Sequence, residues 1–459
     1  MDKKTTMENF ARESFEKGGF NGAWLYAEKG KIVSKGACGF RDPEDTTPIT
    51  EDTIFQLASV SKNFTATAVM LLVREGKLGL EDEITKYFPE IPYPGVTVRQ
   101  LLNHTSGIPD YFDDADWFFK IWKEEKRVPG NDEILRFLRE TEAKPYFAPG
   151  EGLQYSNTGY NLLSLLVERL SGVPYEEFLQ QNIFEPAGMT ATRCCHIRRD
   201  GVPFENYARA SVFENGKYVA DVDSAAYGDV VAFDGLNGDD YVYTNIFDMR
   251  KWDQALREGK VLTPEEQNLM YTPGKLGSGE DAVYDEFKGM TLGYGFGWGT
   301  GRDKALGRIV SHSGGMPGVA TWFERFLDAD RVLVILSNRD AEDYRAFAGF
   351  WNGLQMIARD REPEPIRTIE EIAVKDPDKS KWENYCGKYE HPEDADFIVD
   401  EVFWKDGELH ARAIDDDGIE MTFRLYPIGE DEFGRKGGML KLKFGEGCLM
   451  FDDYTCKKR

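Results

Sequence analysis

Ser59 and Lys62 have the residue types and the spacing that covalent chemistry requires. They precede an apolar run, residues 64–73, whose composition predicts a buried helix. If that helix begins near Ser59, the two side chains share one face, and the hydroxyl sits beside the unpaired N–H groups of the first turn. The positive end of the helix dipole would stabilise negative charge on Ser59, as a serine nucleophile requires. Lys62 could accept the hydroxyl proton if its pKa is depressed, or could stay charged and assist a second base.

The same Ser-x-x-Lys spacing recurs at Ser14 and Lys17, so the motif alone does not identify a site. Residues 8–19 are charged and amphipathic, which predicts a helix with solvated Ser14 and Lys17 side chains. Ser59 differs because it lies between the strand-like segment 53–55 and a helix that is apolar nearly all round. A strand, a turn and a helix are the setting that nucleophiles favour. Position therefore favours Ser59 over Ser14.

A second candidate segment, residues 147–160, places Tyr155 and Asn157 in a loop just before another apolar helix. A tyrosine held near a lysine can have a lowered pKa and serve as a general base, and an asparagine side chain can bind a substrate amide. The pattern Tyr-x-Asn also occurs at residues 243–245, so spacing does not decide between the two. The Pro-Gly turn before Tyr155 and the apolar helix after it favour Tyr155.

Two adjacent glycines, Gly314 and Gly315, follow His312 and Ser313 in a β-rich segment. Glycine in a strand permits close backbone approach by a ligand. Such a strand edge could supply a backbone N–H group to an oxyanion hole and a polar strip that pairs with a substrate. A simple glycine hairpin is the alternative that this segment leaves open.

Composition and charge narrow the choice of partners. The chain has 459 residues, 41% of them hydrophobic and 30% charged, with a formal net charge of −25. That charge repels phosphate backbones and anionic lipids, so we expect no nucleic-acid or membrane partner. The N-terminus lacks the apolar centre of a secretory signal and no run reaches transmembrane length, which predicts a cytoplasmic protein. Six cysteines without Cys-x-x-Cys spacing and five scattered histidines predict free thiols, no metal site and no cofactor.

The positions of the Pro-rich, acidic and Gly-rich stretches predict a large domain, residues 1–360, followed by a small one. Residues 22–40 carry a hairpin signal, and the Pro-rich and acidic stretch 361–381 is typical of a linker. Residues 382–459 alternate short strand candidates with Gly and Asp turns, which predicts a small β-barrel or sandwich. The strand candidates are residues 397–399, 408–412, 421–425 and 440–444.

The segments around Ser59, Tyr155 and His312, in this order, resemble the serine β-lactamase and penicillin-binding-protein superfamily. The resemblance is strongest to its class C β-lactamase-like branch, the S12 peptidase group, and covers roughly residues 8–360. It extends to residues 52–55, 101–107, 238–239, 248–252 and 294–298. The start of the small domain, residues 384–389, resembles the lipocalin-like tail of some relatives.

The resemblance implies an α+β fold, with an antiparallel sheet flanked by helices, an all-helical subdomain and the site between them. It implies that Ser59 is the acylated nucleophile, Lys62 its proton partner and Tyr155 the base. Asn157 would bind both the substrate and the lysine. The backbone N–H groups of Ser59 and Gly315 would form the oxyanion hole.

His312, Ser313 and Gly314 would bind substrate where the family usually has Lys-Thr-Gly. A lysine there faces a substrate carboxylate with a permanent charge, whereas histidine is largely uncharged near neutral pH. Strong β-lactam hydrolysis is therefore not expected. The sequence favours a serine hydrolase that acts through an acyl-enzyme on a small ester, amide or peptide, D-amino-acid substrates included.

The alternative is a catalytically silent penicillin-binding or sensor protein on the same fold, which is acylated without turnover. The presence of Ser59, Lys62 and Tyr155 favours the enzyme, because a sensor has no need of a deacylation base. The sequence leaves open the natural substrate, the choice of Lys62 or Tyr155 as the base, the role of the small domain, and self-association into a homo-oligomer.

Overall fold

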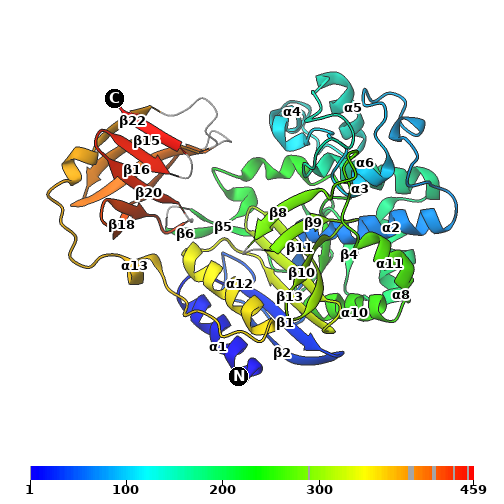
Figure 1. Ribbon diagram of the computed structural model, residues 1–459, viewed down its shortest axis with the longest axis horizontal. Helices are drawn as coiled ribbons and strands as arrows, with labels where there is room; N and C mark the ends of the chain where they lie inside the picture. Colours follow the sequence, from blue (N-terminus) through cyan, green and yellow to red (C-terminus); the bar gives the residue numbers. More distant parts are fainter. Residues whose placement is uncertain are drawn as a thin grey trace. The chain divides into compact units, whose positions relative to one another are not determined.

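A computed structural model describes residues 2–214, 216–287, 290–390, 397–415, 420–437, 440–451 and 454–459. The chain forms two compact units, whose elements are labelled in Figure 1. One unit comprises Asp2–Glu8 and Asn21–Asp340, and the other comprises Asn9–Phe20 and Ala341–Arg459. The predicted division into residues 1–360, 361–381 and 382–459 stays a prediction.

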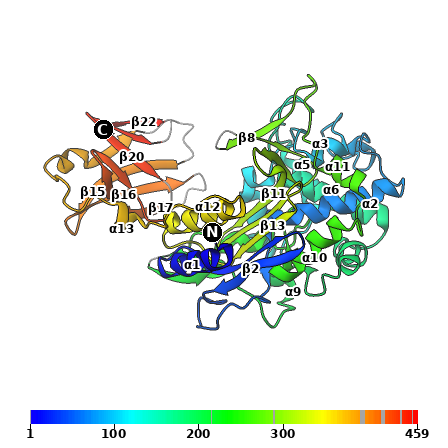
Figure 2. The same cartoon turned by 60° about the horizontal axis from the view of Figure 1, so that its bottom comes forward.

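An eight-stranded antiparallel sheet forms the centre of the first unit, in the order β2-β1-β13-β12-β11-β10-β9-β8. Its strands are β1 Gly22–Glu28, β2 Lys31–Cys38, β8 Val283–Phe287, β9 Met290–Tyr294, β10 Gly299–Asp303, β11 Gly307–Met316, β12 Val319–Phe326 and β13 Arg331–Ser337. Figure 2 shows β2 at one edge and β8 at the other. The expected hairpin within residues 22–40 is formed by β1 and β2. Strands β1 and β13 are apolar nearly throughout, because both of their faces are buried.

Helices and two small sheets complete the first unit. The helices are α2 Lys62–Arg74, α3 Val98–Leu102, α4 Ala115–Lys120, α5 Asp132–Thr141, α6 Asn157–Ser171, α7 Tyr175–Leu179, α8 Glu185–Ala187, α9 Ile197–Asp200, α10 Ile246–Arg257 and α11 Pro264–Met270. The small sheets are β3 Phe55–Gln56, β7 Val242–Thr244 and β4 Arg193–Cys194, and the hairpin β5 Ser211–Glu214 with β6 Lys217–Ala220. Helix α10 packs against β1 and β13 of the central sheet.

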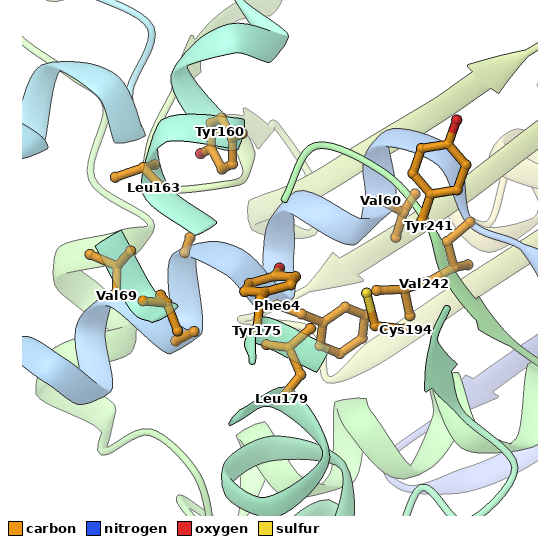
Figure 3. Close-up of a cluster of buried hydrophobic side chains, with 14 of the residues drawn as sticks. Val60, Phe64, Val69, Tyr160, Leu163, Tyr175, Leu179, Cys194, Tyr241 and Val242 are labelled. Atoms are coloured by element: carbon orange, nitrogen blue, oxygen red, sulfur yellow. The ribbon is translucent and has the colours of Figure 1, made fainter. Parts of the chain in front are cut away.

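The buried helix expected at residues 64–73 is α2, which is buried from Lys62 to Leu72. It packs against α6 and α7. Figure 3 shows Phe64 of α2 beside Tyr175 and Leu179 of α7. Each large apolar side chain buried in this way contributes about 1.5 to 3 kcal/mol to stability. The start of α2, where Lys62 lies, is therefore held firmly in the core.

Helix α1, Lys3–Glu16, carries Ser14 of the second Ser-x-x-Lys pair, and Lys17 follows its last residue. The prediction that the Ser14 side chain is solvated was wrong. Ser14 is fully buried, and its Oγ donates to the carbonyl oxygen of Ala346 at 3.1 Å. The segment packs against α12, Tyr344–Ala358, where Phe20 stacks on Phe350 with ring centroids 4.0 Å apart. Amphipathic spacing predicted the helix but not which neighbour would cover its polar Ser14. The pair is structural.

The second unit contains a nine-stranded antiparallel sheet that is nearly closed into a barrel-like form, in the order β17-β16-β15-β14-β22-β21-β20-β19-β18. Its strands are β14 Gly387–Glu390, β15 Phe397–Lys405, β16 Glu408–Asp415, β17 Glu420–Arg424, β18 Tyr426–Gly429, β19 Glu432–Gly434, β20 Lys441–Gly445, β21 Cys448–Phe451 and β22 Tyr454–Lys458. The four strand candidates correspond to β15, β16, β17 and β20, and the other five strands were missed. Aromatic rings fill its core, with Tyr385 stacked on Phe444 at 4.4 Å.

Several absences concern the described residues alone. The six cysteines form no disulfide bond there. None of the described helices is long and apolar enough to span a bilayer. Within the described ranges, no three His, Cys, Asp or Glu side chains gather in a group that could hold a metal ion.

Trypsin is expected to make its first cuts after Lys375 and Lys381, in the predicted linker. Both lysines are exposed, and α13, Ile369–Ile372, is a single short helix within residues 361–381. A protease needs an extended, accessible backbone, which this stretch offers. Mass spectrometry of the fragments checks the sites, and the double variant Lys375→Gln/Lys381→Gln, in which these cuts are lost, is the control. First cuts within residues 22–340 would contradict the predicted division.

Candidate active site

The turn that presents Ser59 is a 3-10 helix, η1 Ala58–Ser61, which leads directly into α2. Ala58 has a left-handed backbone conformation, with φ of 47°, which costs a non-glycine residue about 1 to 2 kcal/mol. Hydrogen bonds to β7 and β12 hold the turn. The N–H of Leu57 donates to the carbonyl of Val242 at 2.9 Å, and Thr321 Oγ1 donates to the carbonyl of Leu57 at 2.6 Å. Ser59 itself is half-buried.

Lys62 lies one residue beyond this turn and its side chain is fully buried. Its Nζ is 2.7 Å from Asn157 Oδ1, 3.0 Å from Ser59 Oγ and 3.0 Å from the carbonyl oxygen of Asp239. These three contacts match the three hydrogens of an ammonium group. When Lys62 loses one proton, its lone pair can accept the hydroxyl hydrogen of Ser59 instead.

Burial lowers the pKa of Lys62 from 10.5 to about 8, because desolvation disfavours the charged amine. The carboxyl groups of Asp239, Asp110 and Asp240 act in the opposite direction and stabilise the ammonium form. A fraction of Lys62 is therefore neutral at pH 7, and this fraction rises through pH 8. The neutral amine can act as a general base toward Ser59.

Tyr155 precedes α6, and its ring centroid lies 4.9 Å from Lys62 Nζ. The ring packs against His104, with centroids 4.3 Å apart, and the Tyr155 hydroxyl is buried. Burial raises the pKa of Tyr155 well above 10, and the Ser59 hydroxyl offsets only part of this effect. The sequence analysis left open a lowered pKa for Tyr155, and the structure shifts this pKa in the opposite direction. At neutral pH Tyr155 is a proton donor.

His312 lies in β11 and is buried and neutral. Its Nδ1 is 2.5 Å from the carbonyl oxygen of Ser313, and its Nε2 is 2.6 Å from the hydroxyl of Tyr294. A carbonyl only accepts, so Nδ1 carries the hydrogen and Nε2 accepts from Tyr294. Burial and the nearby Lys62 lower the pKa of His312 to about 3. The His312 side chain therefore carries no positive charge near neutral pH.

Gly314 lets β11 pack closely against the turn that carries Ser59. A Cβ atom at this position would lie 2.2 Å from the carbonyl oxygen of Leu57, so a larger residue would push the turn away. A Cβ at Gly315 would meet no atom within 4 Å. The pairing of β11 with β10 ends at Ser311, whereas its pairing with β12 continues to Met316. Gly314 thus permits close approach of the chain's own backbone, beside an edge of β11 that β10 does not pair beyond Ser311.

A beta-lactamase family model matches residues 7–353 of the chain. The chain belongs to the beta-lactamase family. Penicillin-binding protein 4* of Bacillus subtilis is 37% identical over 350 residues, which are 74% of this chain and 73% of that protein. The family resemblance noted in the sequence is confirmed.

Solved structures share the beta-lactamase-like α+β fold. The octameric penicillin-binding protein homologue from Pyrococcus abyssi has a TM-score of 0.66 at 23% identity, covering 98% of this chain and 99% of its own. The D-amino acid amidase from Ochrobactrum anthropi SV3, solved with D-phenylalanine, has a TM-score of 0.61 at 24% identity, covering 79% of this chain and 98% of its own. At these identities the likeness establishes the fold alone, as the sequence predicted it.

The structure of this beta-lactamase-family chain separates the two Tyr-x-Asn segments. Asn157 contacts Lys62 directly and Tyr155 covers it, so the segment before α6 joins the Ser59 turn. In the rival segment, Tyr243 is fully buried in β7, and Asn245 caps α10 by accepting from the N–H of Asp248 at 2.9 Å. The second occurrence is therefore structural.

Three buried carboxyl groups near Lys62 were not singled out as site residues from the sequence: Asp110, Asp239 and Asp240. Burial raises the pKa of Asp110 to about 6 and that of Asp240 to about 7, and raises the pKa of Asp239 as well. Two adjacent acids before the apolar strand β7 were a usable signal for Asp239 and Asp240. Nothing in the local pattern distinguishes Asp110 from the many acids around it.

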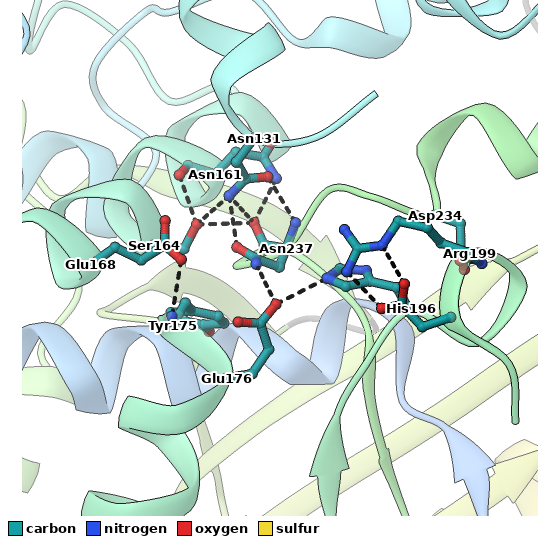
Figure 4. A network of polar contacts seen from close by, with 11 residues as sticks. Asn131, Asn161, Ser164, Glu168, Tyr175, Glu176, His196, Arg199, Asp234 and Asn237 are labelled. Atoms are coloured by element: carbon teal, nitrogen blue, oxygen red, sulfur yellow. Dashed lines mark hydrogen bonds and ion pairs between the residues drawn. The ribbon is translucent and has the colours of Figure 1, made fainter. Parts of the chain in front are cut away.

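A polar network around Asn237, which includes Asn131 and Asn161, supports the loop that leads to Asp239, and Figure 4 shows these three asparagines. Asn161, one turn after Asn157 in α6, donates through Nδ2 to Asp239 Oδ1 at 2.6 Å and to the carbonyl oxygen of Asn237 at 2.8 Å. Asn131 Nδ2 in turn donates to Asn237 Oδ1 at 2.6 Å. The hydrogen bonds of Asn161 and Asn131 thus hold the loop in place, and with it the carbonyl of Asp239 that contacts Lys62.

The variant Asn161→Ala is expected to lower the free energy of unfolding by about 2 kcal/mol, because it removes the Asn161 donor from the buried Oδ1 of Asp239. Urea denaturation followed by circular dichroism measures the change. Gln181→Ala removes an exposed amide and should change stability by less than about 0.5 kcal/mol. Equal losses in the two variants would show that the network does not stabilise the loop.

Proposed function

We propose that this chain is a serine hydrolase that forms an acyl-enzyme through Ser59 on a small amide, ester or peptide substrate. The observation that carries the proposal is the 3.0 Å contact between Ser59 Oγ and Lys62 Nζ, with the lysine buried and its pKa lowered to about 8. A partly neutral lysine beside a serine at a helix start is a nucleophile with its base. The family supports a hydrolase of this general type.

In the proposed acylation, neutral Lys62 accepts the proton of Ser59 as Oγ bonds to the substrate carbonyl carbon. The carbonyl oxygen becomes an oxyanion, which the N–H groups of Ser59 and Gly315 would receive. The tetrahedral intermediate then loses its amine or alcohol, which takes up a proton. Tyr155 is protonated and lies close to Ser59 and Lys62. It would pass its proton to the leaving group and regain one from Lys62.

In the proposed deacylation, a water molecule replaces the leaving group and the same groups act in reverse. Lys62 or Tyr155 takes a proton from the water as its oxygen bonds to the acyl carbon, and the Ser59 oxygen leaves and regains a proton. The family resemblance assigns the base to Tyr155. The directions of the two pKa shifts support Lys62 instead, because the lysine reaches its basic form near neutral pH and the tyrosine does not.

The state of His312 supports substrates without a free carboxylate beside the scissile bond. Both of its ring nitrogens are occupied, by Tyr294 and by the carbonyl of Ser313, and the ring is neutral. Ser313, Gly314 and the open edge of β11 would bind the substrate through uncharged hydrogen bonds. Amides and esters, including those of D-amino acids such as the ligand of the structurally similar amidase, fit this site better than penicillins.

A penicillin-binding or sensor protein is the second candidate. The relative with 37% identity is named a penicillin-binding protein. The raised pKa of Tyr155 also favours slow deacylation, if that residue is the base. Such a protein would hold the acyl group on Ser59 without releasing it.

The cellular setting is part of the proposal. We propose that the protein is cytoplasmic, binds neither nucleic acid nor membranes, and turns over without a cofactor. These three proposals are based on the sequence alone. Self-association into a homo-oligomer is supported by the description of the Pyrococcus abyssi homologue as octameric. The domain calls, residues 1–360 for the hydrolase and 382–459 for the small β domain, belong to the same proposal.

The protein is incubated with D-amino-acid amides, with p-nitrophenyl esters and with a penicillin. We expect product release from the amides and the esters. In Ser59→Ala, both product release and any adduct on the protein should be lost. The rate kcat/KM should rise with pH along a limb near pH 8, because neutral Lys62 is the reactive form. Intact mass and product assays follow both. A lasting adduct without release would favour the sensor, and turnover that survives in Ser59→Ala would refute the mechanism.

The variant His312→Lys is expected to raise acylation by penicillin about tenfold relative to acylation by an uncharged ester, an effect of about 1.4 kcal/mol. A lysine at this position would place a positive charge near the substrate carboxylate. The ratio of the two acylation rates, from intact mass over time, is the measurement. His312→Gln, which stays neutral, is the matched control. An equal ratio in both variants would show that charge at this position does not select the substrate.

A further inference from the structure

The carboxylate of Asp110 binds both the backbone N–H and the side-chain amide of Asn157. Its Oδ2 accepts from the N–H of Asn157 at 2.6 Å and from Asn157 Nδ2 at 3.0 Å. Its Oδ1 accepts from the N–H of Phe112 at 3.1 Å, at the start of the 3-10 helix η3, Tyr111–Asp114. The N–H of Asp110 donates to the hydroxyl of Tyr146 at 2.8 Å. The carboxylate is 7% exposed, so its position is well defined.

These contacts determine which way the Asn157 amide faces. Its Nδ2 donates one hydrogen to Asp110, and its Oδ1 accepts from Lys62 Nζ at 2.7 Å. The second hydrogen of Nδ2 is left for a substrate carbonyl. If the amide were reversed, its oxygen would meet the carboxylate of Asp110 and its NH₂ group would meet the amine of Lys62. A carboxylate accepts only, so it excludes the reversed amide.

We propose that Asp110 is a positioning residue that fixes the Asn157 amide with its oxygen toward Lys62 and one amide hydrogen toward the substrate. The inference rests on the proposed acylation of Ser59, and it assigns a role to a residue outside the set that the family motifs define. Asp110 touches neither Ser59 nor the reacting carbonyl in this arrangement. It acts through Asn157.

Asp110 also acts on Lys62 through its charge, together with the other groups that face the amine. From the adjoining elements these are the carboxyl groups of Asp239 and Asp240, the rings of Tyr155 and Tyr160, and the neutral imidazoles of His104 and His312. Loss of the Asp110 charge would make the ammonium form less favourable. A reversed Asn157 amide, with NH₂ toward Lys62, would act in the same direction. Both effects lower the pKa of Lys62 further.

The variant Asp110→Asn tests the inference. In one orientation of the new amide its NH₂ faces the N–H of Phe112, and in the other it faces Asn157 and favours the reversed Asn157 amide. The Asn157 amide is then no longer fixed by a group that only accepts. We expect kcat/KM at the pH plateau to fall about 10- to 100-fold, and the acid limb of the profile to move about 1 pH unit toward lower pH, since a nearby opposite charge shifts a pKa by about that much. Asp114→Asn, an exposed acid of η3, should leave both unchanged. A lower plateau with an unmoved limb would reduce Asp110 to a structural role and overturn the inference.

A second measurement keeps the inference separate from the proposed function. The resonance of ¹³C-labelled Lys62, assigned by its loss in Lys62→Met, is titrated in wild type and in Asp110→Asn, without any substrate. A lower pKa in the variant supports the inference even if no probe acylates Ser59, in which case the proposed function alone has failed. An unchanged pKa overturns the inference. If Asp110→Asn does not fold, Asp110→Ala replaces it, because it removes the charge without placing a donor against Phe112.

Discussion

The burial of the Lys62 amine is the interaction on which the site depends. An ammonium group in the core loses its water, and a buried charge is tolerated only when hydrogen bonds replace that water. Here the replacements come from a serine one turn away, an asparagine side chain of α6 and a backbone carbonyl of the loop before β7. Three elements must therefore keep their places together. The apolar packing of α2 against α6 and α7 provides the rigidity that this requires.

The turn that carries Ser59 is strained, and the central sheet supports it. Ala58 adopts a conformation unfavourable to any residue but glycine, and it packs with Ala210 and Val319 in a small buried cluster. Strand β11 approaches this turn closely because Gly314 has no side chain. Strain at Ala58 is thus offset by contacts from elements far away in the chain. As a result, Ser59 lies half-buried just before α2, beside the open edge of β11.

The charges around Lys62 work against one another in a useful way. Desolvation favours the neutral amine, while Asp239, Asp110 and Asp240 favour the ammonium form. Their carboxyl groups have raised pKa values for the same reason, burial. The resulting lysine can change protonation near neutral pH, whereas Tyr155 and His312 each keep one form. In the proposed mechanism Lys62 therefore accepts the proton of Ser59, Tyr155 gives a proton to the leaving group, and His312 stays neutral.

The sequence alone identified the family, the fold class and the segments that carry Ser59, Lys62, Tyr155 and Asn157. Helical spacing and apolar runs are local properties, so residues three or four apart on one helix can be read from the pattern. The contact of Asp110 with Asn157 spans 47 positions and that of Asp239 with Lys62 spans 177, and no local pattern specifies them. Ser14 and Ser59 share one motif, yet a different neighbour covers each. The protonation states of Lys62, Tyr155 and His312 depend on loss of water and on distant charges, so only the tertiary structure decided them.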